Sequence, residues 1–155
     1  MSPGTSKKRK TFTIQQANAA LPLVRAIVND FVQLSREIAE RRERLSWLSF
    51  RRPRDNRDLY SEELAQIEEE LQNDSRRLRD FVEELRHLGL EAKSSSEGLV
   101  DFPALLDGRP VNLCWKLGEP EILYWHGRDE TFHDRKPLIV GSAADSGPET
   151  AASAN

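Results

Sequence analysis

The stretch GLVDFPALLDGRPVNLCWKLGEPEILYWH, residues 98–126, differs in character from the sequence before it. It holds two of the three tryptophans, the only cysteine and one of the three histidines. Apolar and polar residues alternate within it, and glycine- and proline-containing turns separate the alternating runs. The pattern predicts a small antiparallel β module with strands over residues 99–102, 111–117 and 121–126, the first of which ends at Pro103.

The pairing register of the last two predicted strands decides which side chains share a face of the sheet. We favour a register that places Lys116 opposite Glu121, because it pairs opposite charges and gathers apolar side chains on one face. In that register Cys114 and His126 point to opposite faces. A three-residue loop would shift the pairing and bring the two tryptophans of the stretch together, and the sequence leaves that alternative open.

Before residue 98 the apolar residues follow helical spacing. From Ile14 to about Leu48, and again from Leu64 to Leu88, they recur in alternating steps of three and four. The segment between them, residues 50–60, is polar and contains turn residues. Two such helices joined by a short connection predict a long antiparallel hairpin that resembles a coiled coil.

Single residues refine this hairpin. Pro22 lies inside the first helix, so we expect a kink there or a short first helix that ends near it. Ser61 is the candidate N-cap of the second helix, and Gly89 is its C-cap signal. Asp74 is the polar residue in the second apolar seam, and we expect Ser35 or an arginine of the first helix opposite it.

Together the patterns predict an α+β protein with a single domain between disordered tails. The predicted parts are a tail over residues 1–11, a domain over residues 12–138 (hairpin 12–89, polar hinge 93–97, β module 98–138) and a tail over residues 139–155.

Composition limits the classes of function. One cysteine excludes an intramolecular disulfide, the N-terminus lacks the apolar run of a signal peptide, and no apolar run is long enough for a membrane span. We therefore expect a soluble cytoplasmic protein. Residues 41–57 contain seven arginines and two acidic residues, a local charge of +5. The acidic start of the predicted second helix can balance this charge, which favours a solvated hairpin tip over a nucleic-acid site.

The sequence lacks a glycine-rich phosphate loop and the common hydrolase motifs. Cys114 and His126 are a conceivable nucleophile and base, but the favoured register separates them. Cys114, His126, His133 and Asp129 match no standard zinc spacing. We accordingly predict no catalytic residue, no metal and no cofactor.

A binding site is the remaining possibility in the β module. Trp125, His126, Arg128 and Arg135 are predicted to form a rim for an acidic group of a ligand or partner, since arginine presents a planar fork to carboxylates. The leading hypothesis for function is a non-enzymatic protein-interaction or adaptor module that forms a homodimer. The alternatives are a small acidic-ligand binder or small enzyme that uses the aromatic β module, and a weak nucleic-acid binder that uses the arginine-rich tip.

Several short motifs carry a resemblance to a known family. They are FT-x-x-x-A-N-x-x-LP-x-V from Phe12, then GLVDFP, DGR-x-V, LCW-x-LGE-x-EI and YWH, and finally Asp129, Phe132, Arg135 and Pro137. Over residues 12–138 the chain resembles the bacterial family catalogued as domain of unknown function 2203. At position 133 histidine stands where the resemblance leads us to expect a small residue. The resemblance implies the two-part layout and supplies no activity or site residue.

Overall fold

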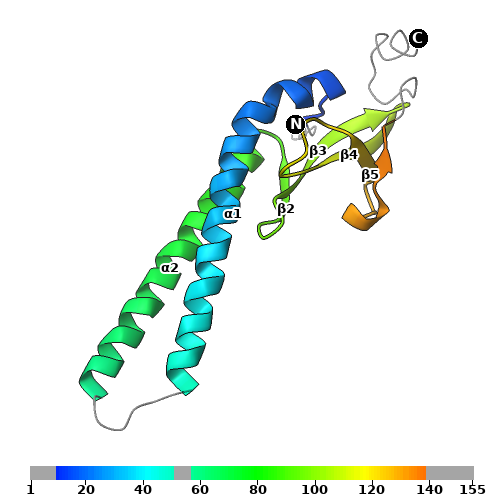
Figure 1. Ribbon diagram of the computed structural model, residues 1–155. Helices are drawn as coiled ribbons and strands as arrows, with labels where there is room; N and C mark the ends of the chain where they lie inside the picture. The colour runs from blue at the N-terminus through cyan, green and yellow to red at the C-terminus, as the bar shows by residue number, and fades with distance from the viewer. Residues whose placement is uncertain (1–9, 51–56, 139–155) are drawn as a thin grey trace, which may run out of the picture.

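The computed structural model describes residues 10–50 and 57–138. Two long helices, α1 (Ile14–Phe50) and α2 (Arg57–His87), form a hairpin, and a β module follows them (Figure 1). The module contains β2 (Glu91–Ser94), β3 (Leu99–Leu106), β4 (Arg109–Lys116), β5 (Tyr124–Gly127), the 3-10 turn η1 (Phe132–Asp134) and β6 (Lys136–Pro137). Its strands make one antiparallel sheet in the order β2-β3-β4-β5-β6.

The predicted α+β arrangement is therefore confirmed. The tails predicted at residues 1–11 and 139–155 lie outside the described residues, apart from Lys10 and Thr11. Neither described helix combines the length and the apolar character that crossing a bilayer requires.

Helix α1 starts at a reciprocal cap. The Thr13 hydroxyl accepts from the backbone N–H of Gln16, and the Gln16 side chain accepts from the backbone N–H of Thr13, both at 3.0 Å. Pro22 lies inside the helix without ending it. In Figure 1 the first turns of α1 run at an angle to the rest, so of the two expected outcomes the kink is the one observed.

The two helices pack along apolar seams, and ion pairs from Arg41 and Arg44 of α1 to acidic residues of α2 join them. Phe31 and Phe81 meet edge to face at 6.2 Å between ring centroids. The buried carboxylate of Asp74 pairs with Arg41 of α1, which confirms the expected arginine partner. Ser35, the other candidate partner, instead shares a hydrogen bond with Ser95 beside the sheet.

The start of α2 corrects one prediction. The helix begins at Arg57, so Ser61 lies in its interior and is not the N-cap. The Tyr60 hydroxyl donates to the Leu48 carbonyl at 2.7 Å, which holds this first turn against the end of α1. A contact between helices therefore outweighs the local capping preference of a serine. Residues 51–56, with three arginines of the predicted tip, lie outside the described residues.

The C-terminal end of α2 leads directly into the sheet. Gly89 has a φ of 95°, and Leu90 N–H donates to the Leu85 carbonyl at 2.9 Å, so the predicted glycine cap is confirmed. Strand β2 begins at Glu91 and pairs with β3. The predicted hinge at residues 93–97 is therefore wrong in part: its residues end an edge strand and form the turn to β3. They are polar because an edge strand faces solvent.

Strand β3 also runs further than predicted, because Pro103 does not end it. Pro103 lies opposite Asn112 of β4, and beyond Asp101 the other edge of β3 has no pairing with β2. A proline fits an edge strand because its missing N–H is not needed there. The Pro103 carbonyl on that edge accepts from Phe12 N–H at 2.7 Å, which ties the start of α1 to the sheet.

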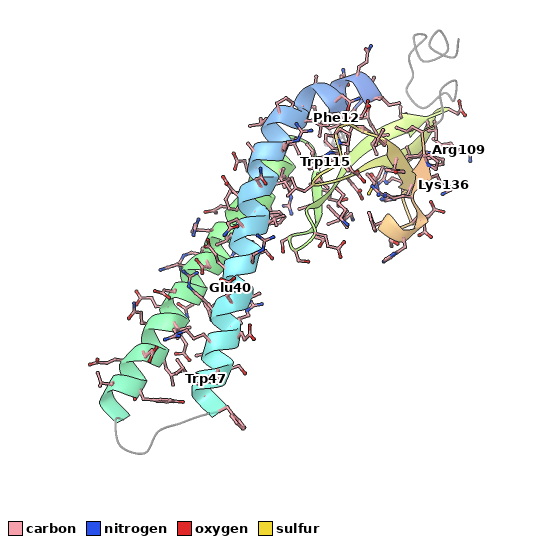
Figure 2. All side chains as sticks on the ribbon, in the orientation of Figure 1. Phe12, Glu40, Trp47, Arg109, Trp115 and Lys136 are labelled. Carbon is pink, nitrogen blue, oxygen red and sulfur yellow. The ribbon has the colours of Figure 1, made fainter. Side chains whose placement is uncertain are left out.

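One face of the sheet packs on the helices. The core side chains on this face are Val100, Phe102, Ala104, Val111, Leu113 and Trp115, with Trp125 packed against them. Trp115 is fully buried and donates from Nε1 to the Glu119 carbonyl at 3.0 Å. Figure 2 places it between α1 and the sheet, and Trp47 at the far end of the hairpin.

The favoured register of β4 and β5 is wrong by one residue. Cys114 lies opposite Tyr124, and Leu113 lies opposite Trp125, which matches the alternative that brings the tryptophans to one face. The physical reason lies in the connection between these strands. Ile122 N–H donates to the side chain of Asn18 in helix α1 at 2.8 Å. The prediction placed Ile122 in the β ladder, but its backbone N–H is bonded to the helix instead.

Removal of the arginine that pairs with Asp74 should destabilise the hairpin. We expect Arg41→Leu to lower the free energy of unfolding by about 2 kcal/mol, because it leaves a buried carboxylate with only Arg77, at 3.6 Å, as a partner. The double variant Arg41→Leu/Asp74→Leu should recover most of that loss. Urea unfolding measures both, and a double variant no more stable than Arg41→Leu would contradict this account.

Candidate functional site

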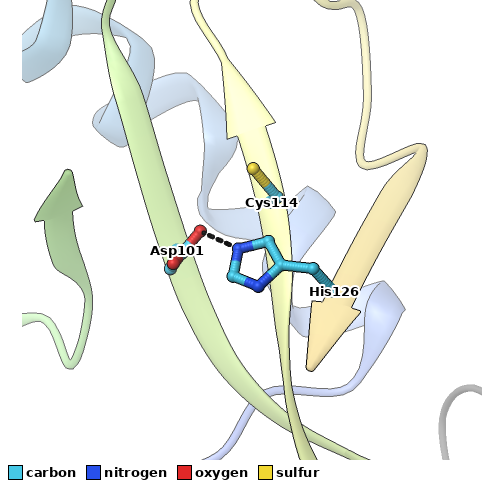
Figure 3. A group of neighbouring side chains, drawn as sticks. All are labelled: Asp101, Cys114 and His126. Atoms are coloured by element: carbon cyan, nitrogen blue, oxygen red, sulfur yellow. Dashed lines mark hydrogen bonds and ion pairs between the residues drawn. The ribbon is translucent and has the colours of Figure 1, made fainter. Parts of the chain in front are cut away.

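The sheet face that points away from the helices carries a cluster of three ionisable side chains, Asp101, Cys114 and His126 (Figure 3). At most 2 % of each residue is exposed. One carboxylate oxygen, the thiol sulfur and one imidazole nitrogen lie within 4.8 Å of one another. Among the described residues, these form the one group of three or more such side chains whose donor atoms could share a metal ion.

Three adjacent strands deliver these side chains. Asp101 of β3 lies opposite Cys114 of β4, and His126 of β5 lies opposite Asn112, two residues from Cys114. Side chains two residues apart on a strand share a face, so the register brings all three together. The prediction that Cys114 and His126 point to opposite faces is therefore wrong, for the same reason as the register itself.

Hydrogen bonds fix the orientation of the imidazole. His126 Nδ1 lies 2.8 Å from the Gly127 carbonyl, which can only accept, so Nδ1 carries a proton. The other nitrogen, Nε2, lies 3.2 Å from Asp101 Oδ1. In a neutral imidazole Nε2 then carries a lone pair, which faces the lone pairs of a carboxylate oxygen. A cation or a proton between the two atoms would remove this repulsion.

The Asp101 carboxylate has an unsatisfied oxygen. Within the described part of the chain, Oδ2 is the buried side-chain polar atom that has no hydrogen-bond partner. Such an atom loses its hydration without compensation, at a cost of about 1–3 kcal/mol. Burial raises the pKa of Asp101, and the charges of His126 and Lys93 oppose this rise. A carboxylate oxygen left without a partner at this depth is typical of a functional site and does not stabilise the fold.

The cluster is not arranged as a nucleophile with its base. Both nitrogens of His126 have oxygen partners, so neither is directed at the Cys114 sulfur to accept its proton. Burial, together with the negative charge of Asp101, raises the pKa of the Cys114 thiol to about 12. The thiol is therefore protonated at neutral pH and is a weak nucleophile.

A pocket of about 290 Å³ opens above the cluster. Its walls come from two segments: Lys93, Glu97 and Leu99 on the β2–β3 side, and Glu130, Thr131, Phe132 and His133 on the β5–β6 side. The second wall is held in place by Glu130, whose carboxylate accepts from Gly127 N–H and from the Lys136 ammonium, both at 2.7 Å. The buried cluster thus forms the floor of a fixed, partly polar cavity.

The structure separates the residues of the predicted rim. Trp125 packs toward the core, on the face opposite His126. Arg128 is exposed in the turn after β5. Arg135 is mostly buried, bonded to Glu119 at 2.9 Å and stacked over the Tyr124 ring at 4.0 Å. Only His126 of the predicted set lines the pocket, and binding of an acidic group by the other three stays a prediction.

The predicted rim and the metal ligands weighed from the sequence both left out Asp101. The available signal is an acidic residue in the apolar run Leu99–Phe102, where a strand buried on both faces would not tolerate a charge without a partner. Of the metal ligands weighed from the sequence, Cys114 and His126 belong to the cluster, and Asp129 and His133 do not. The three residues of the cluster lie on separate strands, so no short sequence spacing reveals them.

Comparison with known proteins gives a family without a function. The family model described as "Uncharacterized conserved protein (DUF2203)" matches residues 10–138. No curated protein and no solved structure gives a significant match to the chain.

The two arginines of the predicted rim should differ sharply in their effect on stability. We expect Arg135→Gln to lower the free energy of unfolding by about 1–3 kcal/mol, because it breaks a mostly buried ion pair and leaves Glu119 without its cation. Arg128→Gln, at an exposed turn position, should stay within about 0.5 kcal/mol of the parent. Equal effects of the two changes in thermal and urea unfolding would contradict these placements.

Proposed function

We propose that this chain, which belongs to the family of uncharacterised conserved proteins named domain of unknown function 2203, binds one zinc ion through Asp101, Cys114 and His126. The observation that carries the proposal is the buried convergence of three different metal-ligating side chains around a carboxylate with an unpartnered oxygen. A cation between the Asp101 carboxylate and His126 Nε2 would compensate the burial of the carboxylate and use the lone pair of Nε2.

The spacing of the donor atoms fits a zinc site. Tetrahedral zinc with nitrogen and oxygen ligands at about 2.0–2.1 Å places those ligands about 3.3 Å apart. His126 Nε2 and Asp101 Oδ1 are 3.2 Å apart. The widest separation in the cluster, up to 4.8 Å, exceeds the value of about 3.5 Å expected between a sulfur and a nitrogen ligand. Binding therefore requires a small contraction of the cluster.

The surroundings also favour zinc over other ions. A thiolate selects soft or borderline metals, and the combination with imidazole and carboxylate is typical of zinc, whereas magnesium and calcium prefer oxygen alone. The bond from His126 Nδ1–H to the Gly127 carbonyl is the outer-shell contact that orients a metal-binding imidazole. The high thiol pKa is no obstacle, because coordination to zinc deprotonates a thiol.

Three protein ligands leave a fourth coordination position. Structural zinc sites usually have four protein ligands, whereas sites that act on small molecules keep one position for water or substrate. The cluster forms the floor of the pocket, so a fourth ligand on the ion would come from the pocket side. A small-ligand binder or a small enzyme therefore fits such a site better than an adaptor module does.

Metal titration tests the proposal. The protein freed of metal with a chelator should bind one zinc ion per chain, and its cobalt form should show a thiolate charge-transfer band. Cys114→Ser should abolish that band, and His126→Gln should weaken zinc binding by about 100-fold or more. His133→Gln, which changes a histidine of the pocket wall outside the cluster, is the matched control and should bind zinc normally. Equal zinc affinity in His126→Gln and the parent would refute the site.

Asp101→Asn should separate stability from binding. Asparagine keeps the shape of the side chain, carries no charge to bury, and its amide N–H can donate to His126 Nε2. We expect the metal-free variant to be at least as stable as the metal-free parent, within about 1 kcal/mol, and to lose the stabilisation that zinc gives the parent. A loss well above that in the metal-free state would show that the cluster is a structural network.

The interaction role predicted from the hairpin stays a prediction. Phe50 and Leu59, near the end of the hairpin away from the sheet, expose 88 % and 64 % of their surface, which is the observation that favours it. Sedimentation analysis at micromolar concentrations should then show the predicted homodimer. A monomer would count against it and leave the zinc proposal unaffected.

A further inference from the structure

We infer that the zinc ion holds a small monoanion, such as a carboxylate, in its fourth position, and that Lys93 is the residue that binds the other side of this anion. The inference rests on the proposed zinc site. The observation behind it is that Lys93, Glu97 and Glu130 line the walls of the pocket above the cluster.

The charge at the proposed centre explains the need for a second cation. The two positive charges of zinc are cancelled by the Asp101 carboxylate and by the thiolate that Cys114 forms on coordination, while His126 stays neutral. An anion in the fourth position would leave the site with one net negative charge in a partly buried cavity. Such a charge is stable only with a nearby cation that also donates hydrogen bonds.

Lys93 is placed to supply that cation. It lines the pocket on the β2 side, in the same cavity as Asp101, Cys114 and His126. Its present partner is Glu91, at 3.4 Å, and both side chains are about half exposed. An exposed pair of this kind contributes little, at most about 1 kcal/mol, so the ammonium can turn to a ligand at small cost.

The other cations near the pocket are already engaged, and one of them is Lys116, whose ammonium lies over the Phe132 ring at 5.4 Å. Lys136 donates to Glu130 at 2.7 Å and stacks over the Trp125 ring, and Arg135 is paired with Glu119. The cavity wall does not include Lys116, Lys136 or Arg135. Among the described residues of its wall, Lys93 is therefore the one lysine or arginine available to an anion.

The acidic side chains of the wall limit the charge of the ligand. Glu97 and Glu130 line the same cavity as Lys93, and Glu130 is the one neutralised by a lysine bridge. A second negative charge on the ligand would meet Glu97 without a compensating cation. The pocket should therefore prefer a monoanionic carboxylate to a dianion. Its volume of about 290 Å³ is near the lower limit for small-molecule sites, so the ligand has few heavy atoms.

Anion titration of the cobalt-loaded full chain tests this inference, with acetate and inorganic phosphate as probes. Acetate should change the visible spectrum of bound cobalt, and phosphate should change it only at higher concentration. Lys93→Met should weaken acetate binding by about tenfold or more, since a charge-assisted hydrogen bond is lost. Lys10→Met removes the same charge beside a different cavity, near the end of α2, and should bind acetate like the parent.

The metal content of each variant is measured first, so that the two proposals fail separately. A parent protein that binds no cobalt or zinc would refute the zinc site itself. Lys93→Met protein that holds cobalt normally and binds acetate as tightly as the parent would refute the role of Lys93 and leave the metal site standing. Tighter binding of phosphate than acetate would refute the preference for a monoanion. Glu97→Gln should bind acetate more tightly than the parent, and unchanged affinity would also count against the inference.

Discussion

The pairing register of β3, β4 and β5 is the constraint on which both sides of the sheet depend. Neighbouring residues of a strand point to opposite faces, so a shift of one residue exchanges the two faces of that strand. The observed register turns Trp115 and Trp125 toward the helices and Cys114 and His126 away from them. The same alignment of strands thus completes the apolar core and assembles the polar cluster.

Contacts with α1 hold that register in place. Asn18 accepts from Ile122 N–H, and Arg25 donates to the Pro120 carbonyl at 3.3 Å, so the connection between β4 and β5 is bonded to the first helix at two points. Arg25 also lies over the ring of Trp115 at 5.8 Å, and Trp115 itself donates to the Glu119 carbonyl in the same connection. The helical hairpin therefore does more than cover the sheet, because it determines which residues of β5 enter the ladder.

The sequence was sufficient for the larger elements and not for the site. The helical spacing of apolar residues and the Gly89 cap are local signals, and each has the predicted counterpart in the structure. The register could not be predicted locally, because it depends on Asn18, about a hundred residues away along the chain. The extent of β3 was missed because Pro103 is compatible with an edge strand, and edges are a property of the whole sheet.

The candidate site was missed for the same reason. Asp101, Cys114 and His126 come from three strands and have no motif spacing, so only the register unites them. Their arrangement also opposes stability, since a carboxylate oxygen is buried without a partner. A fold that keeps such a group at the floor of a cavity is more easily explained by a ligand that satisfies it than by packing alone.

X-ray absorption at the zinc edge of the zinc-loaded protein tests the central claim most directly. The account predicts one sulfur ligand at about 2.3 Å and nitrogen or oxygen ligands at about 2.0–2.1 Å, because Cys114 is the only cysteine of the chain. The sulfur contribution should disappear in Cys114→Ser. A first shell of nitrogen and oxygen alone in the parent protein would show that zinc binds elsewhere, and it would contradict the account.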